Sequence, residues 1–124
     1  MKIKLSSVLC FALMLGLLSG CGKKADTSKS VDQIKSETQT MSVNDLQSNA
    51  EAYAKEITLK KSEVEKIANQ MKSLSPQELF GDKSKGFKDQ LSKIQNDLSA
   101  LTDRYQIYAQ KFQEKGGDIS KIKI

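Results

Sequence analysis

Apolar residues recur along the chain from Ser42 at steps that alternate between three and four residues. Such heptad spacing places side chains on one face of an α-helix and is typical of coiled-coil helices. The first series contains Val43, Leu46, Ala50, Tyr53, Ile57, Val64, Ile67, Met71 and Leu74, with Lys60 in its one polar slot. The second contains Phe87, Leu91, Ile94, Leu98, Leu101, Tyr105, Tyr108 and Phe112. The two series predict helices over about 43–74 and 87–115.

Capping residues flank both predicted helices. Ser42 precedes the first, and a serine at this position can accept a hydrogen bond from a free backbone N–H of the first turn. Gly116 and Gly117 follow the second and supply a stop. Neither helix is interrupted by glycine or proline, so each is expected to be continuous.

The connection between the helices predicts a short helical turn followed by a loop. Pro76 lies at the favoured first position of a turn over 76–80. Its Leu79 and Phe80 are expected to plug one end of the core. The glycines, lysines and serine of residues 81–86 predict a solvated loop without the spacing of a phosphate-binding loop.

Two long helices with a short connection predict an all-α fold, an antiparallel two-helix coiled-coil hairpin over 43–116. Pairing the helices about Gly81 places Tyr53 opposite Tyr108 and Ile67 opposite Ile94. The apolar seam is narrow, which leaves little surface for a third layer.

Charged residues test this register. The pairing puts Glu56 near Arg104, and it brings Glu63 toward Asp97, a repulsion that Lys60 would soften. Lys60 itself is expected to bury its stem and keep its charge in water. On that basis Lys60→Leu should raise the melting temperature.

The N-terminal region has the composition of an export signal. Lys2 and Lys4 precede an apolar run over 5–18, as in the n- and h-regions of signal peptides. The run of about 14 residues reaches roughly 21 Å, short of the roughly 30 Å of a bilayer core, which disfavours a permanent transmembrane anchor. A signal peptide cut without lipidation is a further alternative.

The run ends in Leu18-Ser19-Gly20-Cys21, which resembles the lipobox of bacterial lipoproteins. The resemblance implies that residues 1–20 are a signal peptide cleaved between Gly20 and Cys21, and that the Cys21 thiol carries lipid. Lipoproteins carry two or three acyl chains, enough for a stable membrane anchor. The mature protein would then be membrane-anchored and extracytoplasmic. Because Gly22 rather than aspartate follows the cysteine, the outer membrane is favoured if the source is Gram-negative.

The segments on either side of the predicted hairpin leave alternatives open. Residues 21–42 are polar and predict a lipidated tether, in which Ser30 and Gln33 form a capping box for a short additional helix over 31–41. A mostly disordered spacer is the other interpretation. The tail over 117–124 alternates isoleucine with lysine and is expected to be a frayed end. Contact with a membrane surface, or strand addition to a partner, are its alternatives.

The amino-acid composition limits the chemical functions expected of the chain. Loss of Lys2 and Lys4 with the signal lowers the formal net charge from +5 to +3, and Arg104 is the single arginine, so no nucleic-acid surface is expected. The chain contains no histidine, and both cysteines, Cys10 and Cys21, would be removed or lipidated. We therefore expect no disulfide and no catalytic, cofactor-binding or metal-binding residues, and no enzymatic activity.

These features favour a lipid-anchored envelope protein that presents its hairpin to a protein partner. A self-assembling structural spacer, a homo-oligomer through the same hairpin, is the alternative. A small-ligand-binding lipoprotein ranks last. The membrane contact in each case is the lipid on Cys21.

Overall fold

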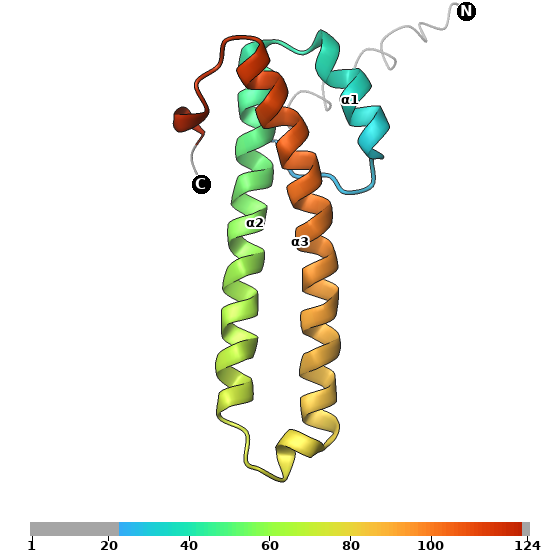
Figure 1. The fold of residues 1–124 in the computed structure, drawn as a ribbon, viewed down its shortest axis with the longest axis vertical. Coiled ribbons are helices and arrows are strands. Elements are labelled where there is room, and N and C mark those ends of the chain that lie inside the picture. The colour runs from blue at the N-terminus through green and yellow to red at the C-terminus, as the bar shows by residue number, and fades with distance from the viewer. Residues whose placement is uncertain (1–22, 123–124) are drawn as a thin grey trace, which may run out of the picture.

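The computed structural model describes residues 23–122, which are organised around two long helices. Helix α2 (Val43–Lys72) and helix α3 (Asp82–Glu114) lie side by side and run in opposite directions (Figure 1). A connection containing the 3₁₀ helix η1 (Glu78–Phe80) joins them at one end of the molecule. The described residues are all-helical, as the heptad pattern predicts, and contain no strand.

Two smaller elements lie at the opposite end. Helix α1 (Val31–Thr40) packs beside α3, and the 3₁₀ helix η2 (Ile119–Lys121) follows α3 after a turn (Figure 1). The narrow seam predicts little surface for a third layer, yet at this end α1 packs against α3. The narrow apolar seam is widened there because α1 and the C-terminal segment bring their own apolar side chains.

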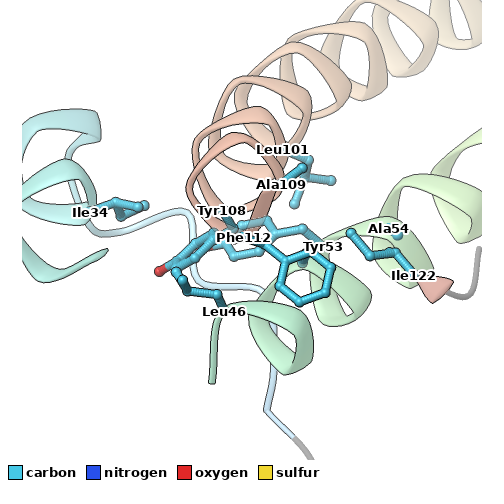
Figure 2. Close-up of a cluster of buried hydrophobic side chains, with 10 residues drawn as sticks. Ile34, Leu46, Tyr53, Ala54, Leu101, Tyr108, Ala109, Phe112 and Ile122 are labelled. Carbon is cyan, nitrogen blue, oxygen red and sulfur yellow. The ribbon is translucent and has the colours of Figure 1, made fainter. Parts of the chain in front are cut away.

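Buried side chains concentrate at this end. Figure 2 shows residues from α1, α2, α3 and the segment after η2 pointing toward one another. The cluster consists of Ile34, Leu46, Ala50, Tyr53, Ala54, Leu101, Tyr108, Ala109, Phe112 and Ile122. We call residues 23–56 and 101–122 the head, and residues 57–100 the arm. Within the arm the only buried hydrophobic side chains are those of Ile67 and Ile94.

Aromatic stacking confirms the predicted pairing of the long helices. The rings of Tyr53 and Tyr108 stack with centroids 5.5 Å apart and an interplanar angle of 26°. Offset stacking of this kind stabilises a pair beyond the area it buries. The heptad series therefore predicts both the helices and their register in the head.

The start of α3 differs from the prediction. The helix begins at Asp82 rather than 87, so residues 82–86 are helical and not a loop. Gly81 is the N-cap residue, and its carbonyl accepts a hydrogen bond from Lys85 N at 3.3 Å. Asp82 places a negative charge in the first turn, where it interacts favourably with the helix dipole. This offsets the roughly 1 kcal/mol helix-propensity cost of Gly86.

The predicted short N-terminal helix is present as α1. Ser30 and Gln33 form the reciprocal capping box, with hydrogen bonds of 3.0 and 3.2 Å. Ile34 and Thr38 of this helix are buried. Residues 23–42 are thus part of the folded head, and the disordered-spacer interpretation is wrong for them.

The C-terminal segment is also ordered through Ile122, so the expectation of a frayed tail is wrong for residues 118–122. Gly116 adopts φ 88°, a left-handed conformation that reverses the chain after α3. Gly117 N then donates to Phe112 O at 2.8 Å. The segment ends with Ile122 buried in the head cluster.

Candidate functional site

The residues predicted for processing lie outside the described part of the chain. Residues 1–20, the cleavage position at Gly20 and the lipidation residue Cys21 all precede Lys23. Lys23 Nζ forms an ion pair with Asp45 Oδ1 at 2.7 Å, in the first turn of α2. Lys23, the first described residue, is therefore held in the head, at the end of the molecule opposite the connection between α2 and α3.

A segment without helix or strand, residues 23–30, crosses the head, and we call it the strap. Tyr53 Oη donates to Asp26 O at 2.6 Å and accepts from Asp26 N at 3.1 Å. Each bond joins a side chain of the long helices to the strap backbone. Burial raises the pKa of Tyr53, so its hydroxyl stays protonated and able to donate.

Arg104 holds the far end of the strap. Its Nε and Nη2 donate to Lys29 O at 3.1 and 2.8 Å, and Nη2 also donates to Thr27 O at 3.1 Å. The predicted neighbour, Glu56, forms no ion pair with Arg104 among the described residues. A guanidinium can bind several backbone carbonyls at once because its planar group holds several N–H donors in fixed directions.

Helix α1 is fastened to α3 at its other end. Lys115 Nζ donates to Gln39 O at 2.9 Å and to Met41 O at 2.7 Å. A cation at the C-terminal end of a helix donates hydrogen bonds to unpaired backbone carbonyls and interacts favourably with the helix dipole. Strap and α1 are consequently joined to the long helices at four places, through Asp45, Tyr53, Arg104 and Lys115.

At the opposite end, residues 75–82 form what we call the tip. Ser75 N donates to Glu78 Oε2 at 3.0 Å, and Glu78 N donates to Ser75 Oγ at 3.3 Å. Lys83 Nζ forms an ion pair with Glu78 Oε1 at 2.7 Å. The Lys83 contact and the Ser75 hydrogen bonds lower the pKa of Glu78 to about 2. These contacts give the tip a defined backbone conformation.

The tip exposes its apolar side chains. Phe80 is 93% exposed and Leu79 is 41% exposed, so the prediction that they plug the core is wrong. The turn bonds from Gly81 N to Glu78 O and from Phe80 N to Gln77 O set the backbone direction that carries Phe80 outward. The half-buried Leu74 and Phe87 form the layer of the apolar seam nearest the tip.

An open groove of about 460 Å³ lies halfway along the arm, between α2 and α3. Ile67 and Ile94, the two buried residues of the arm seam, are among its lining residues. Lys66 and Lys93 stand on its opposite rims. Neither lysine forms an ion pair with another described residue.

Lys60 lines the end of this groove that is nearer the head. The sequence predicts that it buries its stem and keeps its charge in water. Its Nζ lies 3.1 Å from Glu63 Oε2, and the side chain is 23% exposed. The Glu63 hydrogen bond, with the nearby Asp97 carboxylate, raises the pKa of Lys60. Lys60 therefore pairs with Glu63 and lies near enough to Asp97 for its charge to be stabilised by both carboxylates.

Residues 23–122 contain no group of three or more His, Cys, Asp or Glu side chains that could hold a metal ion. No helix in that part of the chain combines the length and the apolar character needed to cross a bilayer. Comparison with protein-family models, with curated proteins and with solved structures gives no match.

Proposed function

We propose that the chain is a lipid-anchored cell-envelope protein that presents its coiled-coil hairpin for protein–protein interaction. The lipobox-like Leu18-Ser19-Gly20-Cys21 supports the anchor, and the division into head and arm supports the presentation. In this proposal residues 1–20 are removed, and Cys21 carries the acyl chains. No catalytic, cofactor or nucleic-acid role is part of it.

The strap sets the orientation of the protein relative to the membrane. Only Gly22 separates Cys21 from the docked Lys23, so the anchor would hold the head close to the bilayer. The arm would then point away from it. Helix α3 has 33 residues and a length of about 50 Å, which gives the reach of the tip from the membrane surface.

Phe80 is the observation that carries the proposal. It is almost fully exposed at the point farthest from the anchored end, on a turn whose conformation is already fixed. Burying such a side chain yields roughly 2 kcal/mol, and a preorganised aromatic loses little entropy on binding. Aromatic residues of this kind dominate the energetics of protein interfaces.

The second candidate is a self-assembling structural spacer. The thin core of the arm favours it, because Ile67 and Ile94 alone are buried between the long helices there. Association of several arms would cover the half-exposed seam. Both candidates place the protein at a membrane, on the extracytoplasmic side, and at the outer membrane if the source is Gram-negative.

Metabolic labelling with a palmitate analogue tests the anchor. The wild-type chain should incorporate label and sediment with membranes, and Cys21→Ala should lose both properties. Retention of label in Cys21→Ala would refute the proposed anchor. A photo-crosslinking amino acid at position 80 should yield protein adducts, and the same group at the exposed Leu59 provides the matched control.

A further inference from the structure

We infer that one end of the head is a lipid-binding surface, which rests on the phospholipid headgroups of the bilayer that holds the anchor. We call this end the base, and it consists of residues 23–24, 39–45 and 114–118. The inference rests on the proposed function, because its occupant is the membrane to which Cys21 would be attached. It adds a second membrane contact to the lipid and thereby fixes the tilt of the arm.

Three segments of the chain meet at the base. Lys115 Nζ donates to Gln39 O at 2.9 Å and to Met41 O at 2.7 Å, which joins the end of α3 to the end of α1 and to the start of α2. Lys23 adds the strap through its ion pair with Asp45. The chain reversals after α1 and after α3 lie together at the end of the molecule opposite the tip (Figure 1).

The length of chain before the strap commits the base to the bilayer. Consecutive Cα atoms are about 3.8 Å apart, so the Cα atom of Cys21 lies at most roughly 7.6 Å from that of Lys23. The acyl chains begin at the cysteine, which places this residue at the level of the headgroups. A tether of this length holds Lys23 against the headgroups and leaves no space for another protein between them.

The charges of the base suit anionic headgroups. Each acid of the base already has a partner, since Asp45 and Glu114 pair with lysines and Asp118 accepts hydrogen bonds at the start of η2. Lys24 is exposed, and neither it nor Lys115 forms an ion pair within residues 23–122. Each lysine near an anionic membrane surface strengthens binding roughly fivefold.

Val43 gives the base an apolar contact. It is the first residue of α2 and is 37% exposed, between the exposed polar residues Ser42 and Asn44. The hydrophobic effect favours transfer of such a side chain from water into the interfacial region of a bilayer. Apolar and basic groups on one surface act together in binding to anionic lipid.

The arm is less suited to contact with the same bilayer. Its groove is lined by Glu63 and Asp97 as well as by lysines, and these carboxylates would face lipid phosphates if the arm lay flat. Asp82 and Asp89 are further exposed acids near the start of α3. Contact through the base alone therefore holds the arm upright, with the tip away from the membrane.

Short-range quenching from the bilayer tests this arrangement. The proposed mature chain has no free thiol, so Val43→Cys, Leu59→Cys and Phe80→Cys can each carry one fluorophore. In vesicles of phosphatidylcholine and phosphatidylglycerol with a nitroxide on the headgroup, the label at position 43 should be quenched most. Position 59, also exposed and apolar, is the matched control about 24 Å farther along α2. Equal quenching at the three positions, or strongest quenching at position 80, would overturn the inference.

Charge reversal tests the role of the cations. Lys24→Glu should lower the ratio of docked to undocked base by roughly 30-fold, because it removes a favourable charge and adds an unfavourable one. The label at position 43 should then lose quenching in the vesicles that contain phosphatidylglycerol. Lys85→Glu reverses an exposed lysine near the tip and should leave this quenching unchanged. Equal quenching in the two variants would reject the base as a lipid-binding surface.

Retention of the chain on the vesicles separates this inference from the proposed function. A retained wild type whose label at position 43 is not quenched rejects the lipid-binding base and leaves the anchor intact. A wild type that is not retained, or a Cys21→Ala variant that is retained equally well, rejects the anchor and the inference with it.

Discussion

Removal of the Arg104 side chain should release the strap while leaving the long helices folded. Arg104 makes three of the hydrogen bonds that hold the strap backbone, two to Lys29 O and one to Thr27 O. The fourth bond of the guanidinium, to Ala100 O, lies within α3. Arg104→Ala therefore separates docking of the strap from formation of the helix.

The magnitude follows from the number of bonds. A hydrogen bond contributes about 1 kcal/mol net, and bonds from a charged donor more, but these are partly exposed and water can replace them. We expect a loss of about 2–3 kcal/mol in the free energy of strap docking, which raises the undocked population roughly 30- to 150-fold. The melting of α2 and α3 should change much less.

Amide hydrogen exchange provides the assay. Asp26 N–H donates to Tyr53 Oη, so its protection reports directly on the docked strap. In Arg104→Ala it should exchange faster by the stated factor, while amides in the middle of α2 keep their protection. Arg104→Lys keeps the charge but not the planar fork, and it should recover only part of the protection. Unchanged exchange at Asp26 in Arg104→Ala would refute the role of the guanidinium.

Three further predictions concern the arm, the tip and the C-terminal turn. Lys60→Leu should add about 1 kcal/mol to the free energy of unfolding and raise the melting temperature by roughly 4–8 °C, because the Lys60–Glu63 ion pair reaches solvent and contributes little. A lower melting temperature would show that the ion pair is needed. Gly117→Ala places a Cβ that overlaps the buried Phe112 ring, and it should lower the free energy of unfolding in urea by about 1–3 kcal/mol. Gly86→Ala meets nothing within 4 Å, so it serves as the control without a clash and should instead stabilise α3 by roughly 1 kcal/mol. The pKa of Glu78 is about 2 in the folded protein, below its ordinary 4.5. The ionised carboxylate therefore stabilises the tip fully above pH 4.5, and this contribution is lost as the pH falls toward 2. An NMR titration of Glu78 with a midpoint near 4.5 would contradict this.

The heptad pattern predicts the long helices and their pairing because helix periodicity is a local property of the chain. The Tyr53–Tyr108 contact follows from the pattern and a short connection. The capping box at Ser30 likewise predicts α1, since a cap involves residues only three apart. Elements with such short-range causes could be predicted from the sequence.

Contacts between distant segments could not be predicted in this way. Arg104 lies 75 residues from Lys29 in the sequence, and no periodic pattern relates a side chain of α3 to a backbone carbonyl of the strap. The direction of Phe80 depends on the backbone of a short turn, which composition does not specify. Residues 82–86 have loop-like composition, yet capping at Gly81 and packing of the helix outweigh it.

The docked strap also determines how the protein would respond to force. A pull on the chain at Lys23 would act along the strap, against the ion pair with Asp45 and then the hydrogen bonds from Tyr53 and Arg104. Bonds loaded along the length of a segment share the load, whereas bonds opened one at a time break in sequence. Tension between a membrane anchor and a partner held at the tip would thus pass through the strap contacts and the whole head before it reaches the arm.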